Sequence, residues 1–288
     1  MTRAADNSVR AAAIQMNSGP DVSANLALAG ELIAEAAAAD CVFALLPENF
    51  ALMPERSRDK ARHAEQPGDG PIQAFLAETA RHHGMWIVGG SLPLASPEPE
   101  RVYGASVVVD DKGDIRAIYR KIHLFDVSLP DGGQSYRESY SMYPGDAAVT
   151  VATPIGRLGL TICYDLRFPE MFRALVDDGA TVFTVPSAFT TVTGDAHWHV
   201  LLRARAVENL SWVIAAGQFG RHPDNRSTYG HSLIVDPWGR IVAERAEGNA
   251  AIVAEIDPGA AKAYREKFPA LENRRLRDQA PTRPQRDE

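Results

Sequence analysis

Short apolar runs alternate with longer segments of helical periodicity along most of the chain. The apolar runs predict β-strands because they are brief, rich in β-branched and aromatic residues, and bounded by turn-forming residues. The strands are predicted at 12–16, 41–48, 85–93, 102–110, 115–121, 156–165, 181–187, 212–217, 231–236 and 251–257. Helices are predicted at 26–39, 71–82, 169–176 and 197–210. Strands that interleave with helices but also follow one another as hairpins predict an α/β fold with mixed sheets.

The same pattern bears on domain organisation. No linker rich in proline, serine or glycine divides the sequence, and no short repeat recurs in it. A chain of 288 residues can bury a sizeable core. Residues 1–288 are therefore predicted to form one domain, with a polar tail, rich in arginine and proline, from about residue 273.

Composition narrows the class of protein. Lys and Arg number 30 against 37 Asp and Glu, a net charge of −7, which disfavours a nucleic-acid-binding protein. No apolar run approaches the roughly 18 residues of a membrane span, and the first residues lack the apolar stretch of a signal peptide. Two cysteines cannot form a disulfide scaffold. We therefore expect a reduced, cytoplasmic protein with no membrane partner.

Several kinds of chemistry lack their sequence motifs. Neither a phosphate-binding G-x-x-x-x-G-K-[ST] loop nor a G-x-G-x-x-G after the first strand is present. His197 and His199 are two residues apart, so on a helix their side chains point apart. The adjacent His82 and His83 follow a helix and are expected to be solvated. We expect no cofactor and no metal.

Three polar residues close apolar strands, where a site would be built. Glu48, Lys121 and Cys163 each end such a run. Each alone has an ordinary interpretation: a solvated carboxylate, a surface ammonium and a core thiol. Together at corresponding strand ends they would supply a base, a cation and a nucleophile to one cleft.

The segments around these residues carry a family resemblance. LLPENF (45–50), YRKIHLFD (119–126) and ICYDLRFPE (162–170) resemble the three characteristic segments of the nitrilase superfamily of carbon–nitrogen hydrolases. The resemblance extends from about Arg10 to Leu276. It implies a four-layer α-β-β-α sandwich, no cofactor, and at least a homodimer whose C-terminal tail crosses the interface.

The resemblance also implies roles for individual residues. Glu48, Lys121 and Cys163 would form the catalytic triad, with Glu138 as a fourth polar residue that orients the lysine and the substrate amide. Cys163 would attack the amide carbon, and Glu48 would carry the proton. Lys121 and the backbone N–H of Tyr164 would hold the oxyanion.

The second half of the chain indicates a branch of this family. The segments at 185–209, 220–222 and 227–239 look like those of deaminated-glutathione amidases, which release 2-oxoglutarate and cysteinylglycine. The related ω-amidases, which act on 2-oxoglutaramate and 2-oxosuccinamate, remain an alternative, although they carry Gly where this chain has Ser187. Another carbon–nitrogen hydrolase and a non-catalytic ligand- or protein-binding member also remain open.

Both amide substrates carry an α-keto acid, so the pocket should offer a cation to a carboxylate. Arg167, four residues after the cysteine, is the candidate, because a guanidinium binds a carboxylate through two hydrogen bonds. An ion pair with Asp165 or Glu170 is the structural alternative. The remaining substrate-binding candidates are Tyr164, Phe189 and Thr190.

Overall fold

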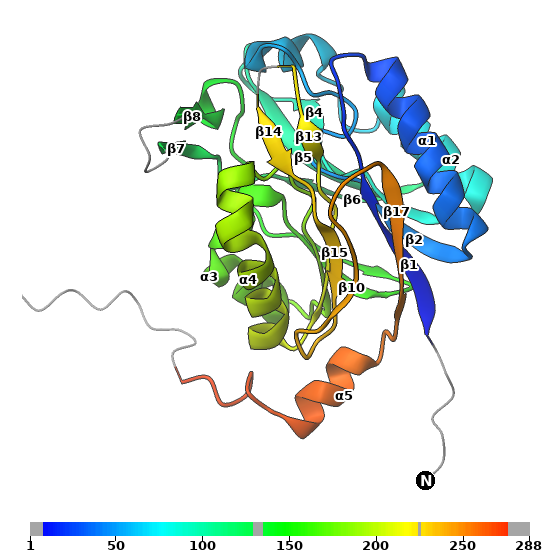
Figure 1. Ribbon diagram of the computed structural model, residues 1–288, viewed down its shortest axis with the longest axis vertical. Helices are drawn as coiled ribbons and strands as arrows, with labels where there is room; N and C mark the ends of the chain where they lie inside the picture. The colour runs from blue at the N-terminus through cyan, green and yellow to red at the C-terminus, as the bar shows by residue number, and fades with distance from the viewer. Residues whose placement is uncertain (1–7, 129–134, 224–225, 276–288) are drawn as a thin grey trace, which may run out of the picture.

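The computed structural model describes residues 8–128, 135–223 and 226–275, and its strands form two large sheets (Figure 1). The first sheet contains β1 (Val9–Gln15), β2 (Cys41–Leu45), β3 (Trp86–Val88), β4 (Leu92–Ala95), β5 (Val102–Val109), β6 (Ile115–Arg120) and β17 (Ala250–Ile256). The second contains β9 (Thr150–Thr153), β10 (Gly156–Leu160), β11 (Val182–Thr184), β12 (Trp212–Ala215), β15 (Ser232–Val235) and β16 (Ile241–Arg245).

Helices and smaller strand pairs complete the described residues. The α-helices are α1 (Val22–Ala38), α2 (Pro71–His83), α3 (Pro169–Asp177), α4 (Thr191–Asn209) and α5 (Ala260–Lys267). Short 3-10 helices span η1 (Ser57–His63), η2 (Glu138–Tyr140) and η3 (Cys163–Arg167). Two further antiparallel pairs join β7 (Asp126–Ser128) to β8 (Ser135–Arg137), and β13 (Phe219–Arg221) to β14 (Ser227–Tyr229). No helix among these residues is long and apolar enough to cross a membrane.

Both sheets are mixed, as the sequence predicts. The first has the order β17-β1-β2-β3-β5-β4, with β6 paired to β5, and the second has the order β16-β15-β12-β11-β10-β9. In each, three neighbouring strands run parallel and their flanking strands are antiparallel. Helices α1 and α2 contact the first sheet, and α3 and α4 contact the second. The expected α-β-β-α sandwich is confirmed.

The first sheet contributes side chains to two hydrophobic clusters, one on each of its faces, and the alternation of side chains along β1 explains how. Ala11 and Ala13 face the second sheet, whereas Ala12 and Ile14 face the helices α1 and α2. All four are fully buried. Because successive side chains of a strand point to opposite faces, a strand buried on both faces is continuously apolar, and this is why 11–14 has no polar residue.

The structure corrects several predicted boundaries. Helix α1 begins at Val22 rather than 26, because the carboxylate of Asp21 accepts the backbone N–H of Ala24 and caps it. The run predicted as one strand at 85–93 is β3 and β4, interrupted by Gly89 and Gly90. Helix α4 begins at 191 rather than 197. The exposed strand β16 and the charged helix α5 lack a strong apolar period and were not predicted.

The predicted polar tail lies mostly outside the described residues, which end at 275. Its first part packs on the sandwich: both terminal nitrogens of Arg274 bind the carboxylate of Asp177 at the end of α3, at 2.6 and 3.0 Å.

Substitution of Gly90 by Ala should destabilise the protein by about 3 kcal/mol or more. Gly90 has a φ of +30°, and a Cβ there would lie 2.0 Å from the carbonyl oxygen of Pro47. The free energy of unfolding from urea denaturation measures the effect. Gly84→Ala is the matched control, because Gly84 has a φ of +61° but open space around it. It should cost only about 1–2 kcal/mol, and an equal loss in both variants would contradict the predicted clash.

Candidate active site

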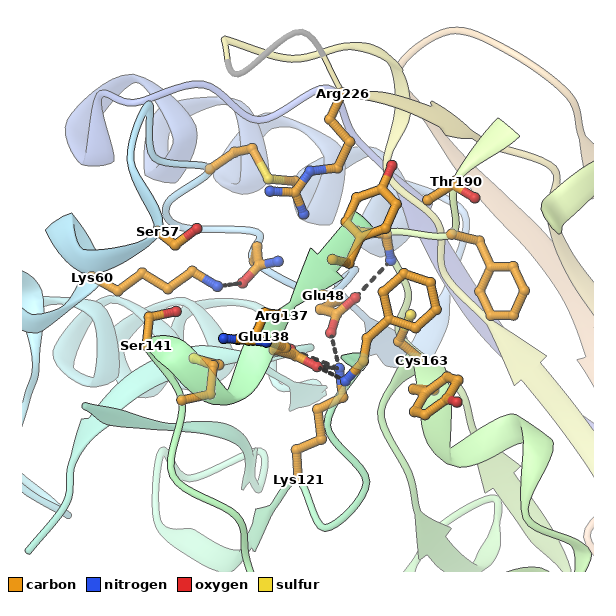
Figure 2. A pocket seen from close by; sticks show the side chains of 18 of the residues that line it. Glu48, Ser57, Lys60, Lys121, Arg137, Glu138, Ser141, Cys163, Thr190 and Arg226 are labelled. Carbon is orange, nitrogen blue, oxygen red and sulfur yellow. Dashed lines mark hydrogen bonds and ion pairs between the residues drawn. The ribbon is translucent and has the colours of Figure 1, made fainter. Parts of the chain in front are cut away.

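All eight residues that the sequence proposes for the site line one cavity, whose space up to and including its open mouth is about 780 Å³ (Figure 2). They are Glu48, Lys121, Glu138, Cys163, Tyr164, Arg167, Phe189 and Thr190. The cavity forms where the two sheets end side by side: β2 and β6 of the first sheet lead to the glutamate and the lysine, and β10 of the second leads to the cysteine. Lys121 follows β6 directly, whereas Glu48 and Cys163 lie three residues beyond their strands.

The centre of the cavity is a buried ammonium between two carboxylates. Lys121 is 1% exposed, and its Nζ lies 2.8 Å from Glu48 Oε1 and 2.9 Å from both carboxylate oxygens of Glu138. Burial alone would lower the pKa of Lys121, but the two carboxylates outweigh it and raise that pKa well above its usual value. The lysine is therefore positively charged at any physiological pH.

The Glu48 carboxylate, whose Oε1 binds Lys121, also contacts the thiol of Cys163. Burial would raise the pKa of Glu48, but the charge and hydrogen bond of Lys121 lower it, and a hydrogen bond from the Cys163 thiol lowers it further. Glu48 Oε2 also accepts the backbone N–H of Ala188 at 2.8 Å. An ionised carboxylate is thus held beside the thiol, in position to accept its proton.

Cys163 occupies an unusual backbone conformation. Its φ is +48°, in the left-handed region, and its N–H donates to the carbonyl of Pro186 at 2.9 Å. A non-glycine residue pays about 1–2 kcal/mol there, and such strain concentrates at functional positions. Burial and the neighbouring Glu48 raise the pKa of the Cys163 thiol well above its usual value, although Lys121 opposes them. The resting sulfur is therefore a neutral thiol.

One buried carboxylate ties the lysine strand to the cysteine turn. Asp165 is fully buried; its Oδ2 accepts the hydroxyl of Tyr119 at 2.7 Å and the backbone N–H of Ile162 at 2.8 Å. Its Oδ1 lies 2.7 Å from the ring Nδ1 of His123. Tyr119 and His123 flank the buried lysine, and Ile162 precedes the cysteine. The sequence offered Asp165 only as a partner of the following arginine, so this linking role was missed.

The candidate carboxylate-binding arginine lies in the cavity wall. The guanidinium of Arg167 stands 5.4 Å from the ring centroid of Phe189 and 5.9 Å from that of Tyr164. Its Nη1 lies 3.3 Å from Nδ1 of His197. Thr190 lines the same wall and caps α4, since its hydroxyl accepts the N–H three residues on.

Sequence reasoning missed several polar residues that line this cavity: Asn49, Lys60, Arg137 and Arg226. The ammonium of Lys60 donates to Asn49 Oδ1 at 2.7 Å, and burial lowers the pKa of Lys60 to about 8. Lys60 belongs to η1, in a segment with no apolar period, so only the folded chain brings it here. With it, five cationic side chains line the cavity against two carboxylates, which favours an anionic ligand.

A metal in this cavity would compete with the lysine. The two carboxylates that line the cavity, those of Glu48 and Glu138, both bind the Lys121 ammonium. Within the described ranges, the cluster of His, Cys, Asp or Glu side chains whose ligand atoms converge lies elsewhere, at His199, His231 and Glu244.

A sandwich of two mixed sheets with a thiol, a carboxylate and a buried ammonium at their shared end defines an amide-hydrolysing class of enzyme. Residues 10–266 match the model of the carbon-nitrogen hydrolase family, and the chain belongs to that family. The resemblance seen in the three sequence segments is thereby confirmed.

Individual members of the family are similar to this chain over nearly its whole length. A protein of Yersinia enterocolitica named deaminated glutathione amidase is 42% identical over 266 residues, 92% of each chain. The Saccharomyces cerevisiae protein named omega-amidase NIT3 is 36% identical over 273 residues, 93% of this chain and 94% of its own. The crystal structure of yeast Nit3, a member of branch 10 of the nitrilase superfamily, matches with a TM-score of 0.81 at 33% identity, over 94% of this chain and 96% of that one.

The Caenorhabditis elegans NitFhit protein has a TM-score of 0.85 at 37% identity. The match covers 93% of this chain but only 65% of the NitFhit chain.

Tyr119→Phe should lower the free energy of unfolding by about 1–3 kcal/mol and reduce turnover. The hydroxyl donates to Asp165 and accepts the backbone N–H of Ile122, so its loss leaves buried polar groups without a partner. Chemical denaturation and steady-state kinetics test this. Tyr140→Phe is the control: Tyr140 is 53% exposed, and its change should stay within about 0.5 kcal/mol. Equal stability of both variants would show that the Asp165 link contributes nothing.

Proposed function

We propose that this protein is an amidase that hydrolyses the amide bond of deaminated glutathione, with Cys163 as its nucleophile. One observation carries the proposal: a neutral thiol lies against an ionised glutamate in a cavity with an excess of positive charge. The name of the 42% identical Yersinia relative supports the choice of substrate.

The first half of the reaction forms a thioester. As the sulfur of Cys163 attacks the amide carbon, Glu48 takes the thiol proton. The carbonyl oxygen becomes an oxyanion, which the ammonium of Lys121 and the backbone N–H of Tyr164 stabilise. Glu138 holds that ammonium through two contacts of 2.9 Å. When the C–N bond breaks, Glu48 gives the proton to the departing amine of cysteinylglycine.

The second half releases the acid. Water attacks the thioester carbon while Glu48 takes a proton from it. The tetrahedral intermediate uses the same oxyanion donors and then expels the sulfur, which recovers its proton from Glu48. The product is 2-oxoglutarate, and the enzyme returns to its neutral thiol. No redox partner is needed, because the sum of both steps is hydrolysis.

The charge of the cavity favours a dianionic substrate. Deaminated glutathione carries one carboxylate at its keto-acid end and one at its glycine end, on opposite sides of the scissile amide. Arg167 is our candidate for the keto-acid carboxylate, where Phe189 and Tyr164 stack against the guanidinium. Lys60 enters the cavity from the side opposite Cys163, with Glu48 between them, and is our candidate for the glycine carboxylate (Figure 2).

An ω-amidase is the second candidate, favoured by the 36% identical yeast relative of that name. Its substrate 2-oxoglutaramate has a single carboxylate and leaves ammonia. Both substrates yield 2-oxoglutarate, so formation of that product compares them on one scale. The dianion should be the better substrate by kcat/KM, because only the longer amide brings a second carboxylate to Lys60.

We also propose a homodimer or a larger homo-oligomer in a reducing compartment such as the cytoplasm. Val192, Val200 and Val207 form one stripe on α4, and they are 54%, 67% and 49% exposed. Such an apolar stripe on a polar-faced helix is typical of an association surface. Both Cys41 and Cys163 are free thiols, as a cysteine nucleophile requires.

Cys163→Ser should retain the fold but lose at least about 10⁴-fold in kcat, since a hydroxyl replaces the attacking sulfur. In the wild type, iodoacetamide should alkylate Cys163 alone. Cys163 lines the cavity with Glu48 beside it to accept its proton, whereas Cys41 does not line the cavity and burial raises the pKa of its thiol to about 11. Mass spectrometry of the native protein identifies the labelled residue.

Glu48→Gln separates the base from the nucleophile. It removes the proton acceptor but keeps the thiol, so turnover should fall, whereas Cys163 should still be alkylated because loss of the Glu48 charge lowers the thiol pKa. Circular dichroism controls for folding. Turnover by Glu48→Gln at the wild-type rate would place the activating base elsewhere.

Lys60→Met should lower kcat/KM for deaminated glutathione about ten- to a hundredfold, mainly through KM, since a charged hydrogen bond contributes about 1.5–3 kcal/mol. For 2-oxoglutaramate the same variant should change little. Arg167→Lys should instead impair both substrates, because both carry the keto-acid carboxylate and lysine lacks the two-pronged geometry. Formation of 2-oxoglutarate measures all four combinations. If Lys60→Met impairs the two substrates equally, Lys60 does not bind the distal carboxylate.

The dependence of kcat/KM on pH is a second test of the role of Lys60. With a pKa of about 8, Lys60 is charged below that pH and loses its proton as the pH rises through it. For the dianion, wild-type kcat/KM should therefore decline above about pH 8. Lys60→Arg keeps its charge there and should lose this alkaline decline.

A further inference from the structure

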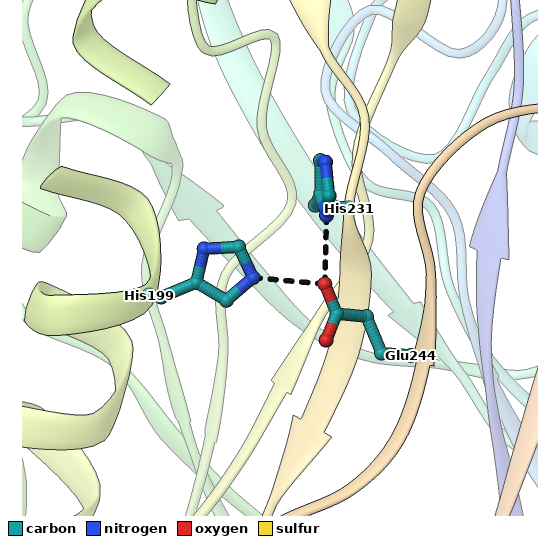
Figure 3. Close-up of side chains that lie close together, drawn as sticks. All are labelled: His199, His231 and Glu244. Carbon is teal, nitrogen blue, oxygen red and sulfur yellow. Dashed lines mark hydrogen bonds and ion pairs between the residues drawn. The ribbon is translucent and has the colours of Figure 1, made fainter. Parts of the chain in front are cut away.

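Three side chains from separate elements meet outside the catalytic cavity (Figure 3). His199 comes from α4, His231 from the turn that precedes β15, and Glu244 from β16. Nε2 of His199 and Nδ1 of His231 each approach the same oxygen, Oε1 of Glu244, at 2.8 and 2.7 Å. The three ligand atoms all lie within 4.8 Å of one another.

We propose that His199, His231 and Glu244 bind a zinc ion. Two imidazole nitrogens and one carboxylate oxygen are a preferred donor set for Zn²⁺, with water in the fourth position. Bonds of about 2.0–2.2 Å in a tetrahedral site place neighbouring ligand atoms about 3.3 Å apart. The two nitrogen–oxygen separations here are about half an ångström shorter, and the two nitrogens, which lie within 4.8 Å of each other, must approach by up to about 1.5 Å, so both rings would rotate to admit the ion. The ring nitrogens that now donate to Glu244 would bind the metal, and each ring proton would move to the other nitrogen.

The backbone and a neighbouring ring hold His231 at the cluster. Its φ is +51°, a left-handed conformation that is rare for a residue other than glycine. The ring of Tyr229 stacks on the His231 ring, with centroids 4.3 Å apart, and the indole N–H of Trp198 donates to the His231 carbonyl at 2.8 Å. Trp198 directly precedes His199 on α4, so one hydrogen bond fixes the turn against the helix that carries the second ligand. Preorganisation of this kind strengthens metal sites.

The charge and the exposure of the cluster also suit a cation. Oε1 of Glu244 lies within hydrogen-bond distance of one ring nitrogen of each histidine, so a carboxylate oxygen stands where the two imidazoles converge. The side chains of His199, His231 and Glu244 are 30%, 26% and 31% exposed. An ion can therefore reach the cluster from solvent without opening the core.

The role of such a site is to fix an element, not to take part in the reaction. None of the three residues lines the catalytic cavity. A bound ion would instead link α4 to β16 and to the turn before β15, and the cap residue of α4, Thr190, lines the cavity. The sequence-based expectation of no metal considered His197 with His199; in the structure His197 contacts Arg167 instead.

The test uses the Cys163→Ser protein, because the catalytic thiol could itself capture zinc. After treatment with chelator, isothermal titration with zinc chloride should give one ion per chain, and zinc should raise the Tm. His199→Ala and Glu244→Gln should each weaken zinc binding at least about tenfold, the loss typical even of residues that only support a ligand. His199 lies on a helix surface and the glutamine is isosteric, so both variants should fold.

The double variant His82→Ala/His83→Ala is the matched control. These two imidazoles also lie close together, with centroids 4.7 Å apart at the end of α2, but outside the cluster. Its zinc affinity should equal that of the parent protein. The proposal fails if the parent binds no zinc, if His199→Ala and Glu244→Gln bind it as tightly as the parent, or if the double variant loses the site instead.

Discussion

The rest of the site depends on one ammonium group that is excluded from water. Lys121 can stay charged in the interior only because Glu48 and Glu138 reach it from different parts of the chain. Loss of one partner of a buried ion pair leaves an uncompensated charge, which is far more costly than the pair is stabilising. The loop after β2, the start of η2 and the end of β6 must therefore close together. This electrostatic requirement brings the ammonium and its two carboxylates to one point in the cavity wall.

A consequence of the paired charges is that the thiol stays protonated at rest. Glu48 is negative and lies beside Cys163, so a thiolate there would face a like charge in a poorly solvated site. Proton transfer and attack on the amide are thus coupled: the carboxylate accepts a proton only as the sulfur forms its bond. Between turnovers the sulfur has low nucleophilicity, which limits its oxidation.

Strands and helices could be predicted from the sequence where a single segment carries both the hydrophobic spacing and the signals for its ends. The doubly buried strand β1 and the helix α2, which begins with Pro71 and ends before Gly84, follow from spacing and end signals alone. Strand ends pointed to Glu48, Lys121 and Cys163, and the family segments added Glu138. Lys60 and Asp165 could not be assigned in this way, since their roles arise from contacts with residues distant in sequence. The exposed strand β16 escaped prediction for a related reason: its pairing with β15, not its own composition, makes it a strand.

The pairing of β1 with β17 has a bearing on synthesis of the chain. Val9 to Gln15 pair in register with Ile256 back to Ala250, so strands from opposite ends of the fold are neighbours in one sheet. On the ribosome, β1 emerges long before its partner and presents an open edge until residue 256 is made. The side chain of Gln15 in β1 also waits for partners near the end of the chain, since it accepts the backbone N–H of Ser232 and donates to the carbonyl of Gly248. Until β17 is made, the incomplete chain therefore carries an unpaired strand edge, which is a template for pairing with another chain.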